Sequence, residues 1–131
     1  MSADVDDTSA DSIVDEAIGL RDRGQEAEAI ALLNKVLEEH PNSSAAHAIL
    51  GGLRWDYQDL EGARRCFAEA VRLSPKMELA SLGLFHTSYK LGDKDAAFGE
   101  MRRFLSISES VEYRKLIREF KKMGEDQHDD S

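Results

Sequence analysis

The side chains that could bind a metal ion or act as a nucleophile are scattered along this sequence of 131 residues. The four histidines are His40, His47, His86 and His128, and Cys66 is the lone cysteine. They lack the short, regular spacing of a zinc site, and the sequence has no HExxH motif. Cys66 falls in a stretch expected to be helical, so we expect a buried, unreactive thiol. The sequence therefore predicts no metal site.

Motifs for catalysis are absent as well. The sequence has no glycine-rich phosphate loop and no nucleophile elbow. The adjacent acids Asp6–Asp7 and Asp129–Asp130 stand near the two ends of the chain. Carboxylates in general acid–base catalysis need a fixed geometry, which such end segments do not supply. We therefore expect no catalytic residue, no cofactor and no enzymatic activity.

Two aromatic residues are well suited to recognition. Trp55 is the only tryptophan, and Tyr89 follows it after 34 residues. Trp and Tyr dominate the hot spots of protein interfaces. Both side chains could contact a partner, or they could pack against a neighbouring part of the fold. The sequence leaves both roles open, and the elements that carry the two residues decide between them.

A period of 34 residues runs through the chain. Pro41 and Pro75 are separated by it, and so are Ala29, Ala63 and Ala97. Within each period, apolar residues recur every three or four positions, as in amphipathic helices. Proline cannot continue the helix before it, so each proline marks a helix end. A period of this length is typical of repeat proteins.

Helix ends are marked at equivalent places in the repeats. Gly24 and Gly92 can adopt the left-handed conformation that follows a helix, and Gln58 occupies the equivalent place between them. Asp59 and Asp93 come next and can cap the following helix. These signals divide the chain into the units 10–43, 44–77 and 78–111.

A further helix is expected at residues 110–123. Its apolar face carries Tyr113, Leu116, Ile117 and Phe120, and its opposite side is basic. The terminal units of a repeat array need a cap over their exposed face. We interpret this helix as that cap. The alternative is a helix that docks onto a partner or swaps into a second copy of the chain.

The net charge is −9, and the two end segments contain acidic residues without any Lys or Arg. We expect residues 1–9 and 124–131 to be disordered acidic tails that flank one domain at 10–123. No basic surface suited to phosphates is present, so we expect no nucleic-acid partner. The sequence has no run of about 20 apolar residues and no basic, apolar start typical of a secretory signal. We therefore expect no membrane association and a cytoplasmic location.

The period and its aligned breaks resemble the tetratricopeptide-repeat family over roughly residues 10–109. The resemblance implies an all-α, right-handed solenoid of three antiparallel helix pairs, with helix 110–123 as a seventh. It also implies small residues where helices cross, and Gly51, Ala63 and Ala70 match this pattern in the second unit. The third unit has the larger Phe85 and Phe104 at equivalent places, so we expect it to pack differently.

The resemblance also implies that the first helix of each unit lines a concave groove. One known activity of the family grips chaperone C-termini with a Lys, Asn, Asn, Lys, Arg set. Its five places hold Val14, Ile18, Gly52, Leu79 and Gly83 here, so we expect no carboxylate-clamp binding of a chaperone tail. The groove is expected to be apolar and aromatic instead. The predicted partner-binding residues are Val14, Ile18, Ala48, Gly52, Trp55, Leu79, Leu82, His86 and Tyr89.

The predicted function is a scaffold or adaptor for protein–protein interaction. A peptide or helix of an unidentified partner protein would lie in the groove, where bare backbone at Gly52 and Gly83 would allow close approach. Two alternatives stay open. One is a small chaperone or immunity-type inhibitor of a secreted effector or toxin. The other is a structural module that associates with itself, for example as a homo-dimer.

Overall fold

The computed structural model describes the backbone of residues 2–129 and the side chains of residues 10–124. These residues form seven α-helices and no strand, which confirms the predicted all-α fold. The helices are α1 (Ser2–Asp22), α2 (Glu26–Glu39), α3 (Ser44–Asp56), α4 (Leu60–Leu73), α5 (Glu78–Lys90), α6 (Lys94–Leu105) and α7 (Val111–Asp129).

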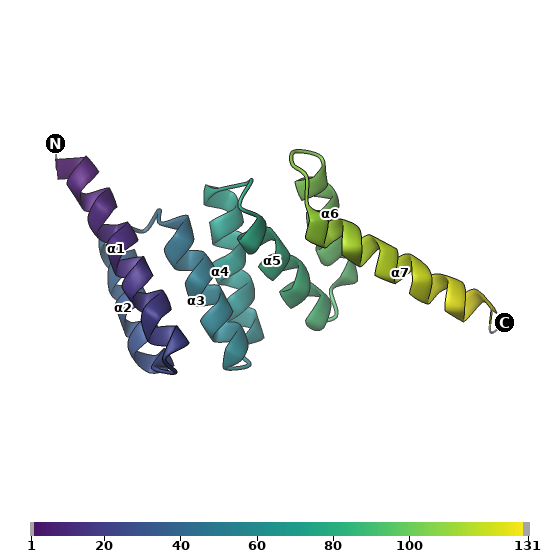
Figure 1. Ribbon diagram of the computed structural model, residues 1–131, viewed down its shortest axis with the longest axis horizontal. Helices are drawn as coiled ribbons and strands as arrows, with labels where there is room; N and C mark the ends of the chain where they lie inside the picture. Colours follow the sequence, from purple (N-terminus) through teal and green to yellow (C-terminus); the bar gives the residue numbers. More distant parts are fainter. Residues whose placement is uncertain (1, 130–131) are drawn as a thin grey trace.

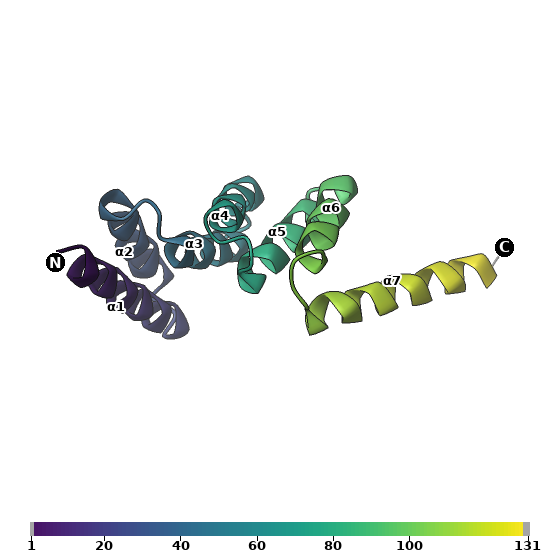
Figure 2. The same ribbon diagram turned by 90° about the horizontal axis from the view of Figure 1, so that it is seen from above.

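The helices stack as consecutive pairs along an elongated molecule. Helix α1 packs against α2, α3 against α4, and α5 against α6, and the pairs follow one another from one end to the other (Figure 1). Viewed from above, α1, α3 and α5 lie along one side and α2, α4 and α6 along the other (Figure 2). Helix α7 extends away from the last pair. The first helices of the pairs therefore share one face of the stack.

The turn inside each pair has the same backbone conformation in all three pairs. Gly24, Gln58 and Gly92 have φ angles of 80°, 66° and 89°, in the left-handed region. The residue after each of them donates a hydrogen bond to the carbonyl five positions earlier, as from Gln25 to Leu20 at 2.8 Å. This is the Schellman pattern of helix termination. Asparagine and glycine tolerate this conformation best, so Gln58 is the unusual residue of the three.

The helix caps predicted from the sequence are confirmed. The Asp59 carboxylate accepts a hydrogen bond from the Gly62 N–H at 3.0 Å, and Asp93 accepts one from Ala96 at 3.1 Å. Asp59 also pairs with Arg54 at 2.9 Å. The hydrogen bond from Gly62, together with Arg54, lowers the pKa of Asp59 below its ordinary value. Each cap satisfies a backbone donor that would otherwise lack a partner.

Small residues lie at the helix crossings of the first two pairs. Ala29 and Ala63 are fully buried. A Cβ atom at Gly51 would lie 3.0 Å from the Phe67 ring, so glycine is what lets α3 approach α4 this closely. In the third pair, the buried rings of Phe85 and Phe104 fill the equivalent space.

A buried polar network fastens α7 to the third pair. The Tyr113 hydroxyl donates to the Ser81 carbonyl oxygen at 2.9 Å, and the Ser81 hydroxyl donates to Glu100 at 2.7 Å. Arg103 pairs with Glu100 at 2.6 Å. Burial, as the main cause, raises the pKa of Tyr113 to about 12. The sequence alone predicts only an apolar contact for Tyr113.

The terminal helices extend into both segments for which the sequence predicts tails. The backbone is helical at residues 2–9 and 124–129. The prediction rested on the lack of apolar residues in helical spacing, a pattern that reports burial against a core and not helix formation itself. Residues 1, 130 and 131 lie outside the described residues, and the domain boundaries remain predictions.

Candidate functional site

A continuous groove runs along α3, with α1 and α5 as its walls. It consists of two hollows of about 550 and 410 Å³. Ala48, Ile49 and Leu79 line both of them, so the hollows join end to end. Of the nine predicted partner-binding residues, eight line this groove: Val14, Ile18, Ala48, Gly52, Trp55, Leu79, Leu82 and His86.

The floor of the groove lies close to the backbone of α3 because two small residues occupy one face of that helix. Ala48 and Gly52 are four positions apart, so they follow one another along the same side of the helix. A Cβ atom at Gly52 would meet nothing within 4 Å. The open space at Gly52 is therefore part of the groove.

Gly83 lines the larger hollow of the groove, beside Phe67. Its bare backbone, which the sequence predicts to admit a partner, also accommodates a side chain of the neighbouring pair. A Cβ atom there would lie 2.4 Å from Cε1 of Phe67, whose ring covers this stretch of α5. Gly83 thus makes room for a core side chain of the neighbouring pair. The sequence could not show this because Phe67 lies 16 positions away on another helix.

Tyr89 does not join the other eight residues. Its ring is stacked on Phe85, with centroids 6.1 Å apart, and it contacts Phe120 of α7 at 5.6 Å and Phe98 at 6.2 Å. It lines neither hollow of the groove. The ring belongs instead to an aromatic cluster formed by Phe85, Tyr89, Phe98 and Phe120. Of the two roles left open for Tyr89, packing against the C-terminal helix is the one the geometry gives it.

Trp55 lies at the end of the groove away from the start of α3. Its side chain is half-buried, and Nζ of Lys90 lies 5.3 Å from the ring centroid, within range of a cation–π interaction. His86 lies on α5, one wall of the groove. Its ring forms a T-shaped contact with Phe85, with ring centroids 5.2 Å apart. Partial desolvation lowers the pKa of His86, which favours a neutral imidazole at pH 7. Trp55 and His86 can thus offer apolar surface and a hydrogen bond without a positive charge.

Carboxylates border the apolar floor. Asp11 and Asp15 of α1 line one hollow, and Asp56, the last residue of α3, lines the other. Arg21 also lines the second hollow, but it is paired with Asp22 at 3.1 Å. Among the described side chains, none of the three carboxylates on the border lies within 4.0 Å of a Lys or Arg nitrogen.

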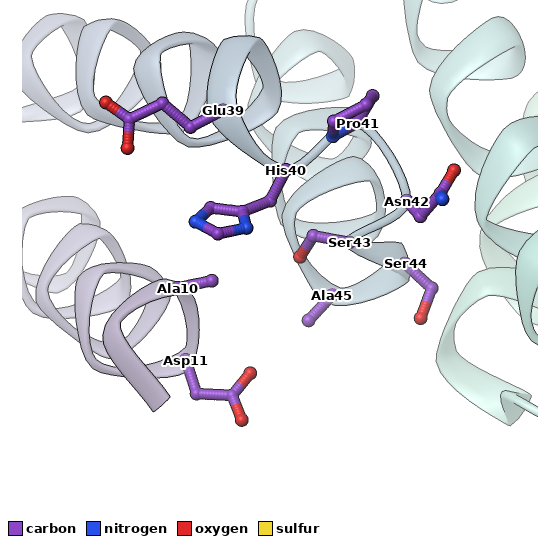
Figure 3. Close-up of a pocket in the computed structure, with 9 residues that line it drawn as sticks. All are labelled: Ala10, Asp11, Glu39, His40, Pro41, Asn42, Ser43, Ser44 and Ala45. Atoms are coloured by element: carbon purple, nitrogen blue, oxygen red, sulfur yellow. The ribbon is translucent and has the colours of Figure 1, made fainter. Parts of the chain in front are cut away.

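A polar hollow of about 530 Å³ continues the groove beyond the start of α3 (Figure 3). It shares Asp11 and Ala45 with the adjoining part of the groove. Figure 3 shows that Asp11 comes from α1, whereas His40 and Ser43 come from the connection between α2 and α3. This hollow was not predicted from the sequence, because its residues show no motif and come together only when α1 packs beside the connection between α2 and α3.

The remaining chemical features have structural explanations. Cys66 is half-buried, and burial raises the pKa of its thiol, which disfavours the reactive thiolate. Within the described part of the chain, no group of three or more His, Cys, Asp or Glu residues is arranged to hold a metal ion. None of the described helices is both long enough and apolar enough to cross a membrane.

Comparison with known proteins shows that the fold is similar to that of tetratricopeptide-repeat domains. The family model for the tetratricopeptide repeat matches residues 16–43. The second TPR of Spaghetti (RPAP3), solved with the HSP90 peptide SRMEEVD, is similar in structure, with a TM-score of 0.73 and 18% identity. The alignment covers 82% of this chain and 100% of that one. No curated protein matches the sequence significantly.

Two larger proteins contain a similar arrangement of helices. An IFIT1 monomeric mutant with Gppp-AAAA has a TM-score of 0.69 and 22% identity, and MamA has a TM-score of 0.68 and 22% identity. Each alignment covers 76% of this chain, but only 26% of the IFIT1 chain and 54% of the MamA chain. At these identities the likeness shows the fold alone.

Proposed function

We propose that this tetratricopeptide-repeat chain binds an apolar segment of another protein in the groove along α3, and that it catalyses no reaction. The observation that carries the proposal is the open, apolar floor at Ala48 and Gly52 beside Trp55 and Leu79. Proteins with this fold generally mediate protein–protein interaction, and the similar TPR of Spaghetti was solved with a peptide.

Exposed apolar side chains in the groove supply the driving force. Leu79 has 58% of its surface exposed, although it stands between the two hollows. Burial of apolar surface contributes about 25 cal/mol per Å², before the entropy loss of association. A partner segment that covers Leu79, Leu82 and the exposed part of Trp55 would therefore be stabilised by burial.

The binding mode differs from a carboxylate clamp. Val14, Ile18 and Leu79 stand at three of the five clamp places, and all line the groove. The other two places are glycines, so no clamp position carries a cation or an amide for a terminal carboxylate. A partner is therefore held by apolar contact. Adaptors, small chaperones and inhibitors of a toxin could all use such a groove. The cytoplasmic location remains a prediction.

The test is a pair of glycine substitutions. Gly52→Leu places a side chain in the groove, whereas Gly99→Leu on α6 adds the same side chain outside it, where a Cβ atom meets only Arg102 at 4.0 Å. Both variants should fold, because leucine is a better helix former than glycine by about 0.5–1 kcal/mol. Peptides selected on the native protein from a display library of helical segments should bind Gly99→Leu normally and lose binding to Gly52→Leu.

Trp55→Ala provides a second measurement on the same peptides. Truncation of an aromatic hot spot weakens binding by about 2 kcal/mol or more. Because Trp55 is only half-buried, the free energy of unfolding should fall by less than for Phe67→Ala, which we expect to lower it by about 3–5 kcal/mol. Selected peptides that bind all of these groove variants as tightly as the native protein would show that the recognition surface lies elsewhere.

A further inference from the structure

We propose that the groove selects a cationic partner: a segment of about three helical turns with an apolar face for α3 and Lys or Arg side chains near both of its ends. This inference rests on the groove function proposed above and names the partner class. It is based on the carboxylates that border the apolar floor of the groove and outnumber the cations there.

The groove presents negative charge that is not already neutralised. Asp11, Asp15 and Asp56 are exposed, and none of them is within ion-pair distance of a base among the described residues. Of the nearby cations, Arg21 pairs with Asp22, whereas Lys90 keeps its positive charge over the Trp55 ring, so the three carboxylates outnumber it. Helix α1, which forms one wall, contains seven acidic residues and a single arginine. The net field at the groove is therefore negative and attracts cations.

The positions of the carboxylates determine the length of the partner. Asp11 and Asp15 are four positions apart on α1, so they share one face of that helix. They adjoin Ala45 and Ala48 of α3, whereas Asp56 is its last residue. The distance along α3 from Ala45 to Asp56 is about 17 Å at 1.5 Å per residue, which equals roughly three turns of a partner helix. Basic residues about eleven positions apart would then reach both ends.

The same charges disfavour acidic partners. The peptide SRMEEVD, seen on the TPR of Spaghetti, carries three acidic side chains. On this chain it would meet carboxylates along α1 and apolar side chains at the clamp places. Like charges brought together in an interface oppose binding. Polyphosphate ligands are disfavoured for the same reason.

A second copy of this chain is a weaker candidate for the occupant. Helix α7 has the required chemistry, with Lys and Arg on one side and apolar residues on the other. Its apolar face is already in use, because Tyr113 is fully buried and Phe120 packs against Phe98 with centroids 5.1 Å apart. Insertion of α7 into a neighbouring groove would require that packing to be undone.

The experiment compares peptide selection on two variants with the same net charge. Asp11→Lys/Asp15→Lys reverses the charge of the groove wall, and the control Glu112→Lys/Glu119→Lys makes the same change on exposed residues of α7. The probe is a display library of helical peptides with a fixed apolar face, in which the end positions vary among Lys, Glu and Gln. Selection is carried out at low salt on each variant and on the native protein.

We expect Lys at both end positions of peptides selected on the native protein and on the α7 control. On the groove variant we expect Glu at the end beside α1 and Lys still at the end beside Asp56. By fluorescence anisotropy, a Lys peptide should bind the native protein about tenfold more tightly than its Glu counterpart, a preference that shrinks above about 0.5 M salt. SRMEEVD should bind more weakly than the Lys peptide.

Three results would overturn the inference. Equal selection of Lys, Gln and Glu on all variants, with Gly52→Leu still blocking binding, would leave the proposed function intact and remove its charge preference. Selected peptides that bind Gly52→Leu normally would overturn both proposals. A concentration-dependent dimer of the native protein that Gly52→Leu abolishes and Gly99→Leu preserves would identify a second copy as the occupant.

Discussion

The first two helix pairs and the third pair with α7 solve the same packing problem in different ways. In the first two, alanine and glycine at the crossings let the helices approach closely, as at Ala29 and Gly51. In the third, the fully buried Ala97 keeps one small crossing site, but the buried rings of Phe85 and Phe104 occupy the other two and pack with Tyr113 of α7. One repeat period thus supports two types of core. The groove lies along α3 of the second pair, with α5 of the third pair as one wall. The face of the third pair toward α7 is covered by an aromatic cluster.

The boundary between the two regions determines where the groove ends. Trp55 and Tyr89 are equivalent in the repeat, yet Trp55 lines the groove and Tyr89 packs against Phe120. The difference comes from α7, whose rings cover the face that Tyr89 would otherwise present. An aromatic residue at a repeat position therefore has no fixed role, because its neighbours decide which surface it covers.

Removal of α7 should have the largest effect on this comparison. Truncation after Ser108 would expose Phe85, Phe98 and Phe104, which now pack against Tyr113 and Phe120. A contiguous apolar patch of this kind leads to aggregation or a large loss of stability. Size-exclusion chromatography and thermal melts would measure it. A truncated chain that stays monomeric with an unchanged Tm would show that the third pair needs no cover.

Overpacking should break the close crossing of the second pair. Ala63→Leu adds three carbons to a fully buried site, so we expect a loss of about 1–3 kcal/mol in the free energy of unfolding. Ala68→Leu is the matched control, because Ala68 is exposed on the same helix α4. Urea unfolding of both variants measures the difference. Equal stability of the two would mean that α3 and α4 do not need a small residue at their crossing.

The buried hydroxyl of Tyr113 should have an intermediate effect. Tyr113→Phe removes the donor to the Ser81 carbonyl, and we expect a loss of about 1–2 kcal/mol at pH 7. Because the pKa of Tyr113 is raised to about 12, the neutral phenol stabilises the fold fully below pH about 10. That contribution is lost as the pH rises through about 12.

The alkaline behaviour gives a specific control for this network. Stability curves between pH 8 and about 12 should fall more steeply for the native protein than for Tyr113→Phe, which has no phenol to ionise. If the two curves are parallel, ionisation of Tyr113 does not contribute to the pH dependence of stability. The buried hydrogen bond would then be excluded, whatever the variant's stability at pH 7.

Local signals in the sequence predicted the repeats, and contacts between repeats determined the rest. The helix caps at Asp59 and Asp93 follow from residue types within one turn, so they could be predicted. The packing of Gly83 against Phe67 and the hydrogen bond between Tyr113 and Ser81 join helices that are far apart in the sequence. A single sequence does not encode such pairings as a local pattern. The groove could be predicted in part. The repeat period indicates which positions face the groove, but it does not show which side chains lie beside one another there.

The smallest predicted effect concerns the three equivalent turns. Gln58 adopts a φ of 66° where the other two turns have Gly24 and Gly92. The left-handed conformation destabilises a residue with a Cβ atom by about 1–2 kcal/mol, and part of the gain from glycine is offset by the greater entropy of the unfolded chain. We therefore expect Gln58→Gly to raise the free energy of unfolding by about 0.5–1 kcal/mol, measured by urea titration. Gly92→Ala is the reverse control: a Cβ atom there meets nothing within 4 Å, so its expected loss of about 1 kcal/mol is conformational alone. A destabilised Gln58→Gly beside an unchanged Gly92→Ala would mean that the side chain of Gln58, and not its backbone, holds the turn of the second pair.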